Sequence, residues 1–288
     1  MRASYDYGLG RAGNVARGAI TTAPALPAGF EASNPVRTWG GAEGESVAEG
    51  EKQVARYLQH RDRLVTAEDF RTIARRTPGI DLGRVEVLPA FNPDASAEPG
   101  DAPGAVTLLV IPRYDALQPD APLPDRLFLD ALCDHLDPRR LVTTEVFLRG
   151  PTYTPIWITV GIDVVAGASI PQVREDVRKR LLAFLAPLPA EGEPDGGWPL
   201  RRSVMQLDLV AQASRVDGVR HVNGVDLAAG AGPPATTVEL GGWLVLPRVV
   251  GIAVAAGDAV DLDAVRGTGP TEQPTGLVVP VPVIPETC

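Results

Sequence analysis

The chain has 288 residues and a mass of 30.4 kDa, and 44% of its residues are hydrophobic, which is enough for two or three domains with real cores. Its formal net charge of −9 argues against DNA or RNA as a partner, because a protein that grips phosphates needs a basic surface. Only two cysteines occur, and no apolar stretch approaches the roughly 20 residues needed to cross a bilayer. We therefore expect a cytoplasmic protein with no integral membrane segment and no disulfide framework.

The first two regions of the chain differ in pattern. Residues 1–44 are rich in Gly, Ala and Pro without helical periodicity, so we expect an extended segment that is the remainder of a larger β-rich domain. Residues 45–103 are expected to hold two helices and a strand, because Ser46 with Glu49 and Thr66 with Asp69 match the capping box of a helix start. The expected apolar faces are Val47, Val54 and Leu58 in the first helix and Phe70, Ile73 and Ala74 in the second.

Periods of two and of 3.6 residues alternate across residues 104–229. Strands are expected at 105–111, 144–149, 156–165 and 219–227, and helices at 125–136, from Ser169 and from Ser203. In the strand 156–165, alternation points one side inward, formed by Ile156, Ile158, Val160, Ile162 and Val164. The apolar positions at helical spacing are Val173, Val177, Leu181, Phe184 and Leu185 in the helix from Ser169, and Val204, Leu207 and Val210 in the helix from Ser203. Strand, helix, strand, strand, helix, strand is the ferredoxin-like order, here with an extra helix before the last strand. The sequence therefore predicts an α+β fold with a ferredoxin-like central module.

Two short regions follow. Residues 230–266 contain short strand patterns broken by Gly241-Gly242 and Gly257-Asp258, which predicts a small β-meander. Residues 267–288 contain five prolines among few helix formers and are expected to form an extended, Pro-rich tail.

The residues that carry chemistry do not gather into a known motif. His60, His135 and His221 are scattered, and Cys133, His135 and Asp137 point in different directions on one helix, so no metal site is expected. The glycines of residues 8–13 lack the strand before and the helix after that a phosphate loop requires. A nucleophile elbow is also absent from the sequence. We therefore expect no catalytic residue, no cofactor and no enzyme activity.

Charged and aromatic residues next to predicted helix ends are the candidate interface residues. Arg61, Asp62 and Arg63 lie between two capped helices, and Arg139-Arg140 follow the helix 125–136. Such charges either form local ion pairs or contact a neighbouring protein. Trp198, in a Gly-Gly-Trp-Pro loop, is the best candidate for an exposed interface anchor.

Several short motifs, taken in order, resemble those of one protein family. The most informative is residues 61–70, RDRLVTAEDF. The others are residues 7–15, 18–20, Asn34-Pro35, Gly40-Gly41, 104–107, 139–144, 150–153 and 196–200. Their order and spacing resemble the middle-to-C-terminal part of the baseplate J-like wedge proteins of contractile phage tails and phage-tail-like contractile injection systems. In that family the motifs around Gly8 and Asn14 lie well inside the chain, so this sequence resembles the later part of a longer relative.

This resemblance implies a structural baseplate wedge subunit that assembles around a central spike or hub and links the baseplate to the sheath. The implied partners are other wedge subunits, spike or hub proteins and a sheath or sheath-initiator protein, in a large symmetric hetero-oligomer. The implied location is a tail-like particle or virion baseplate. Two other classes remain open. One is a ferredoxin-like small-molecule sensor or acyl-phosphate hydrolase, the latter needing an Arg and an Asn such as Asn223 to converge on an anion. The other is a host-surface adhesin or tail-fibre module.

Overall fold

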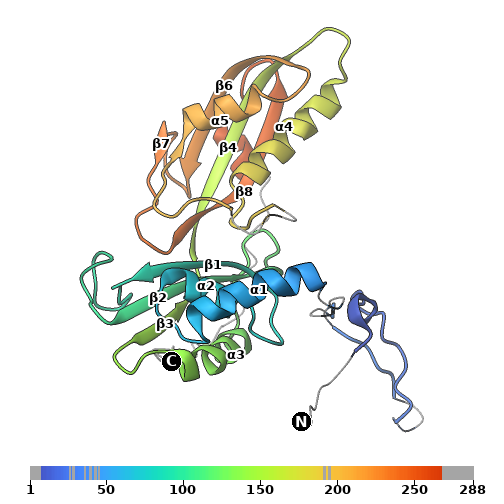
Figure 1. The fold of residues 1–288 in the computed structure, drawn as a ribbon. Helices are drawn as coiled ribbons and strands as arrows, with labels where there is room; N and C mark the ends of the chain where they lie inside the picture. Colours follow the sequence, from blue (N-terminus) through green and yellow to red (C-terminus); the bar gives the residue numbers. More distant parts are fainter. Residues whose placement is uncertain are drawn as a thin grey trace, which may run out of the picture. The chain divides into compact units, whose positions relative to one another are not determined.

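The computed structural model describes residues 8–25, 27, 30–35, 37–38, 41, 44, 46–190, 193 and 196–267. The predicted tail 267–288 therefore lies outside the described residues from position 268 onward, and so does the side chain of Glu49 in the predicted Ser46 capping box. The chain divides into two compact units at the bond between Leu148 and Arg149 (Figure 1). Each unit has its own sheet and its own helices.

The first unit is built on a three-stranded sheet. Its elements are η1 (Gly10–Gly13), α1 (Val47–His60), α2 (Ala67–Ala74), β1 (Leu82–Pro89), β2 (Ala105–Pro112), α3 (Arg126–Leu136), η2 (Asp137–Arg139) and β3 (Glu145–Arg149). The strand order is β1-β2-β3, and β1 pairs antiparallel with β2, with Val85 opposite Val110. The structure confirms the predicted second capping box, because Thr66 Oγ1 accepts from the Asp69 amide and Asp69 Oδ2 accepts from the Thr66 amide.

The core of the first unit lies between this sheet and the helices α2 and α3. Alternate residues of a strand point to the same face of the sheet, so every second residue of each strand can contribute to this core. The buried members of this cluster are Leu64, Phe70, Ile73, Ala74, Val85, Val87, Leu108, Val110, Leu132, Leu136, Val146 and Leu148. The predicted buried face of α2 is thus confirmed. The predicted apolar positions of α1 are not part of this core, since Val47, Val54 and Leu58 are 81%, 58% and 65% exposed.

The second unit has a three-stranded sheet of mixed direction. Its elements are β4 (Thr152–Val164), α4 (Ile170–Phe184), β5 (Val204–Met205), α5 (Gln206–Ala213), β6 (Val219–Ala229), β7 (Thr237–Val238), β8 (Val245–Ala256) and α6 (Leu262–Arg266). The order is β6-β4-β8; β4 is antiparallel to β6 and parallel to β8, and β5 pairs separately with β7. The predicted inward face of β4, from Ile156 to Ile162, is fully buried.

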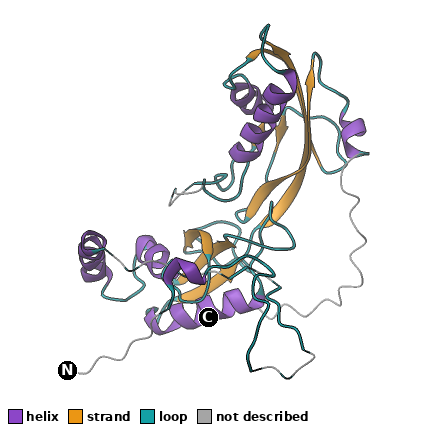
Figure 2. Ribbon diagram, turned by 90° about the vertical axis from the view of Figure 1, so that its right-hand side faces the viewer, coloured by secondary structure: helices purple, strands orange, loops and turns teal. Residues whose placement is uncertain are grey.

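Helices cover both faces of the second sheet. Figure 2 shows α4 and α5 packed along one face of the long strands. On α4 the predicted inner residues Val173, Val177 and Leu181 are buried. The opposite face carries Trp157 and Gly251, and a Cβ atom added at Gly251 would meet the Trp157 ring at 2.4 Å and Val265 of α6 at 3.2 Å. Helix α6 therefore covers this second face.

The α+β class is confirmed, but the ferredoxin-like detail is not. Strands β2 and β3 of the predicted module 104–229 belong to one sheet, while β4 and β6 belong to another. The expected β-meander over 230–266 is not found either, because β8 joins the sheet of β4 as one long strand. Local signals found these strands, although β4 begins at Thr152 and not at the predicted Ile156. A pairing partner so distant in sequence leaves no local signal.

Two predicted helix starts differ from the structure in detail. Ser169 is the N-cap residue of α4, but its side chain makes no capping hydrogen bond. The helix predicted from Ser203 begins only at Gln206, because Val204-Met205 form β5 and the Ser203 hydroxyl donates to Glu239. This shift turns the helix, so Leu207 is 77% exposed while Leu209 is fully buried.

Candidate functional site

Two of the predicted interface segments lie side by side in the first unit. The Leu64 amide donates to the Arg139 carbonyl at 2.9 Å, and Leu64 forms a parallel β-bridge with Arg140. The Leu64 side chain is 1% exposed and belongs to the core, which fixes this contact. We call residues 60–64 together with residues 135–140 the arginine junction.

Three of the predicted interface residues are engaged inside the arginine junction. Asp62 Oδ1 accepts from Arg139 Nε at 2.9 Å, although the two residues are 77 positions apart. Arg140 Nε donates to Asp137 Oδ1 at 2.5 Å, and its Nη1 donates to the Thr144 carbonyl at 3.0 Å. The side chains of Asp62 and Arg139 are 47% and 25% exposed, so their ion pair is partly screened by water. These contacts agree with the local role that such charges usually have.

Arg61 and Arg63 are placed differently. Both are exposed, and neither side chain has a hydrogen bond or ion pair to another part of the described chain. The backbone turns sharply here, with positive φ angles of 47° at Arg61 and 58° at Asp62. A left-handed conformation costs a non-glycine residue about 1–2 kcal/mol. The turn is held because the Asp62 amide donates to His60 Nδ1 at 2.9 Å and the Arg63 amide donates to the His60 carbonyl at 2.9 Å.

Two histidines, His60 and His135, both belong to the arginine junction. The sequence gave no indication that they would. His60 is 5% exposed, and its Nε2 atom has no partner within the described residues. Burial lowers the pKa of His135, the charge of Arg139 lowers it further, and Asp62 raises it in part. No spacing rule links these histidines, since they belong to two distant segments that are joined at the Leu64–Arg140 bridge.

The junction does not assemble a metal site. Across the described ranges, no group of three or more His, Cys, Asp or Glu side chains is arranged to hold a metal ion. Cys133 packs against the first core, and Asp137 pairs with Arg140. Cys133 and Asp137 therefore have different neighbours.

Trp198 is not the exposed anchor that the sequence suggested. Its side chain is 1% exposed, and its indole N–H donates to the Arg202 carbonyl at 2.9 Å. The ring meets Phe184 of α4 edge-on at 5.3 Å, and the Arg202 guanidinium lies 5.0 Å from the ring centre. The amide of Trp198 donates to the Ala186 carbonyl, so the loop folds back on the end of α4. The prediction of exposure is therefore wrong, because the glycine-rich loop turns the ring inward.

Side-chain hydrogen bonds join two arms of the N-terminal segment. Asn14 donates to the Gly41 carbonyl at 2.8 Å and accepts from the Gly41 amide at 2.9 Å. The Thr38 hydroxyl donates to the Gly13 carbonyl at 2.6 Å and accepts from the Val15 amide at 2.7 Å. We call the described residues of 10–20 and 34–41 the N-terminal clamp. Its bonding residues lie in or beside the motifs at 7–15 and around residues 34–41, so the structure gives those motifs a shared physical role.

Asn34 closes the other end of the N-terminal clamp. Its Oδ1 atom accepts from the Ile20 amide at 2.9 Å, and its Nδ2 atom donates to the Ala16 carbonyl at 2.9 Å. The sequence placed these asparagines in loops but gave no sign that they bind the opposite arm.

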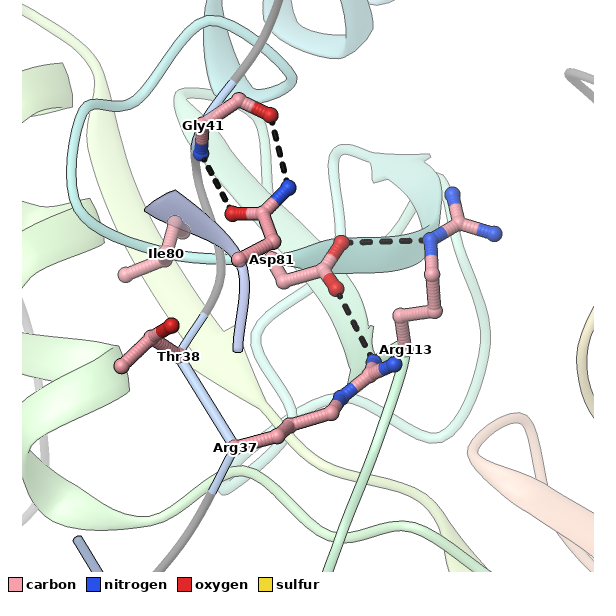
Figure 3. A pocket seen from close by; sticks show the side chains of 7 residues that line it. Arg37, Thr38, Gly41, Ile80, Asp81 and Arg113 are labelled. Atoms are coloured by element: carbon pink, nitrogen blue, oxygen red, sulfur yellow. Dashed lines mark hydrogen bonds and ion pairs between the residues drawn. The ribbon is translucent and has the colours of Figure 1, made fainter. Parts of the chain in front are cut away.

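A shallow pocket of about 290 Å³ lies where the N-terminal clamp meets the sheet of the first unit (Figure 3). Its lining residues are Asn14, Arg37, Thr38, Gly41, Ile80, Asp81 and Arg113. Asp81 lies between two guanidinium groups, with Arg113 Nε at 3.1 Å and Arg37 Nη2 at 3.4 Å. Arg37 also stacks over the Tyr114 ring at 4.7 Å. Because the carboxylate is already paired with two arginines, this arrangement fastens the clamp and offers no activated base or nucleophile.

Asn223, the asparagine that a hydrolase site would need, is used structurally. Its Nδ2 atom donates to Asp163 Oδ1 at 3.1 Å and to the Gly257 carbonyl at 2.8 Å. It therefore ties β6 to β4 and to the end of β8. In the part of the chain that the structure describes, no helix is both long and apolar enough to cross a membrane.

Comparison with known proteins identifies a similar fold. No family model matches the sequence, and no curated protein matches it. A chain in the cryo-electron microscopy structure of the anti-feeding prophage baseplate, six-fold symmetrised, is similar with a TM-score of 0.51 and 17% sequence identity. The likeness covers 83% of this chain and 47% of that chain, so the protein spans about half the length of its structural neighbour. At this identity the comparison establishes a common fold.

Proposed function

We propose that the protein is a structural component of the baseplate of a contractile tail or injection particle, and within it a wedge subunit of the baseplate J-like kind. The observation that carries the proposal is the fold shared with a chain of the anti-feeding prophage baseplate over 83% of this chain. The motif at residues 61–70, which resembles the baseplate J-like family, supports it independently.

The way the chain is held together suits a subunit that changes its contacts. The N-terminal clamp is attached through Arg37 and Asp81, whose side chains are 44% and 31% exposed, and the arginine junction is closed by the partly exposed Asp62–Arg139 pair. Exposed pairs contribute about 0–1 kcal/mol each, so they can exchange partners at little cost. We propose that such contacts adjust while the two cores stay rigid, and that the partners are other wedge subunits, spike or hub proteins and a sheath or sheath-initiator protein.

The sensor and hydrolase alternative has less support. A hydrolase site would need Asn223 aimed at an anion, and its amide is instead bound to Asp163 and Gly257. An adhesin would favour aromatic residues in exposed loops, and Trp198, the loop tryptophan considered for such a role, is buried. No observation favours either class over the baseplate component.

The test is a tagged pull-down from the native host, with mass spectrometry of the bound proteins and negative-stain microscopy of the eluate. We expect sheath, tube and spike proteins together with ring-shaped or tail-shaped particles. Deleting the gene is expected to abolish assembled particles, and the wild-type gene supplied in trans should restore them. A protein recovered alone, with particle numbers unchanged in the deletion strain, would overturn the proposal.

Complementation also tests the unpaired arginines. The double variant Arg61→Glu/Arg63→Glu is expected to restore far fewer particles than the wild type, because both side chains are exposed and lack a partner in the described chain. The matched control is Arg126→Glu, which reverses an exposed arginine on α3 whose pair with Asp130 is 3.6 Å long. Equal complementation by both variants would remove Arg61 and Arg63 from the interface.

A further inference from the structure

Helix α1 presents an apolar stripe that no described residue of its own unit covers. Positions three, four and seven residues apart share a helix face, and the stripe follows that spacing. Its members are Val47, Val54, Tyr57 and Leu58, which are 81%, 58%, 51% and 65% exposed. Among the side chains of α1 that the structure describes, His60 alone is buried. The hydrophobic face that the sequence predicted therefore exists but points to solvent.

A helix of this kind needs a partner to persist. Isolated helices shorter than about 12–15 residues are marginal in water, and most helical stability in proteins comes from packing an amphipathic face. Helix α1 has 14 residues and is followed by the left-handed turn at Arg61 and Asp62. Gly50 lies on the same face as Val54 and Tyr57, and a residue without a side chain lets another backbone approach closely.

The charges beside the stripe are distributed so that the helix complements itself. Glu51, exposed, lies three residues before Val54, and Arg61, exposed and without a described partner, lies three residues after Leu58. The Arg61 amide donates to the Tyr57 carbonyl at 2.7 Å, so Arg61 directly follows the last turn of the helix, where the chain enters the left-handed turn. If two copies of α1 pair antiparallel with Val54 against the partner's Leu58, Glu51 of each copy lies beside the partner's Arg61. Two-fold symmetry then makes this contact twice.

We infer that the apolar stripe of α1 is a self-association surface, on which a second copy of this chain docks its own α1 antiparallel. The occupant follows from the charge complementarity of Glu51 and Arg61, because a two-fold pair matches an acid with a base at both ends of one stripe. The apolar residues supply the attraction, and the charges fix direction and register. This inference does not rest on the proposed function, since the isolated chain should show it.

The test is the oligomeric state of the purified full chain, measured by sedimentation velocity over a range of concentrations. We expect a concentration-dependent dimer. The variant Val54→Ser/Leu58→Ser should weaken self-association at least about tenfold, because these residues form the centre of the contact. The matched control is Leu207→Ser on α5, which removes a leucine that is 77% exposed on a different surface. Circular dichroism of each variant establishes that the two cores remain folded.

A charge swap tests the register. Glu51→Arg alone and Arg61→Glu alone should each weaken the dimer, whereas the double variant Glu51→Arg/Arg61→Glu should recover it, because the two charges exchange places in both copies. A chain that stays monomeric to its solubility limit overturns the inference and leaves the proposed function untouched. A dimer that is insensitive to Val54→Ser/Leu58→Ser also overturns it, and a dimer that the double charge variant does not restore overturns the antiparallel register.

Discussion

At the scale of single residues, one glycine shows how the N-terminal clamp is closed. A Cβ atom added at Gly41 would lie 2.2 Å from the Gly10 carbonyl oxygen and 2.8 Å from Asn14 Oδ1. No real Cβ atom tolerates a backbone oxygen at that distance, so the two arms would have to separate. The paired motifs around residues 10 and 41 are therefore linked by a close backbone approach, which a sequence motif alone does not reveal.

We expect Gly41→Ala to open the clamp locally. Amide hydrogen exchange at Val15 and Thr38, whose N–H groups are bonded across the arms, should become faster, while the cores keep their protection. Gly13→Ala is the control, because a Cβ atom there meets nothing within 4 Å. Unchanged exchange in Gly41→Ala would show that the close approach does not hold the arms together.

The arginine junction should respond to pH through His135. Burial and the charge of Arg139 lower the pKa of His135 in the folded protein, so the folded state binds fewer protons there than the unfolded chain, whose imidazole titrates near about 6.5. The free energy of unfolding should therefore fall as the pH drops below about 6.5. Asp62 opposes this trend and Arg76 adds to it.

The measurement is urea unfolding between neutral pH and pH 5 for the wild type and for His135→Gln. Because glutamine does not titrate, the variant should lose less stability on acidification than the wild type. A steeper loss in His135→Gln would mean that the folded protein favours the protonated imidazole.

At the scale of elements, helices and strands with a local signal were predictable. The helix at 125–136 was found because Asp125 caps it, accepting from the Phe128 amide at 2.8 Å, and β4 was found from its alternating isoleucines and valines. The failures arose where tertiary pairing decided the outcome. Val204-Met205 became a strand only because Thr237-Val238 lies beside them, and the helix that follows therefore starts later and leaves Leu207 exposed.

Helix α5 allows a direct test of one difference between the predicted and the observed structure. Leu209→Ala is expected to cost about 2–5 kcal/mol of unfolding free energy, because it empties a fully buried site. Leu207→Ala, at a position 77% exposed, should cost less than about 0.5 kcal/mol. Chemical denaturation of both variants shows which leucine lies on the buried face of α5. The observed helix buries Leu209, whereas the helix predicted from Ser203 runs through Leu207. Equal losses of unfolding free energy in the two variants would contradict the observed burial of Leu209 and exposure of Leu207.

At the scale of the whole molecule, the candidate site belongs to the first unit. The arginine junction, the N-terminal clamp and the pocket at Asp81 all lie before Leu148. The sequence supplied the residues of the junction but not its geometry, since Asp62 and Arg139 meet through the packing of α2 and α3. The pocket was not predictable, because Arg37, Asp81 and Arg113 come from three segments without a common motif.

The second unit should fold when expressed alone. Residues 149–267 contain every strand of the β6-β4-β8 sheet and the helices on both of its faces. We expect this fragment to unfold in one cooperative transition, as single domains of this size usually do. The fragment 149–240 is the control, because it lacks β8 and should not show that transition. A disordered 149–267 fragment would mean that the unit needs the rest of the chain.

The parallel pairing of β4 with β8 also has a consequence for synthesis. Strand β4 ends at Val164, but its neighbour β8 begins only at Val245, so the ribosome must translate α4, α5 and β6 before that edge can close. Contacts between such distant segments form slowly, because a long loop must be ordered first. During this interval the nascent chain exposes an apolar strand edge, which is a template for pairing with another chain. Ribosome pausing after β6 would thus lengthen the period in which the newborn protein is most prone to aggregate.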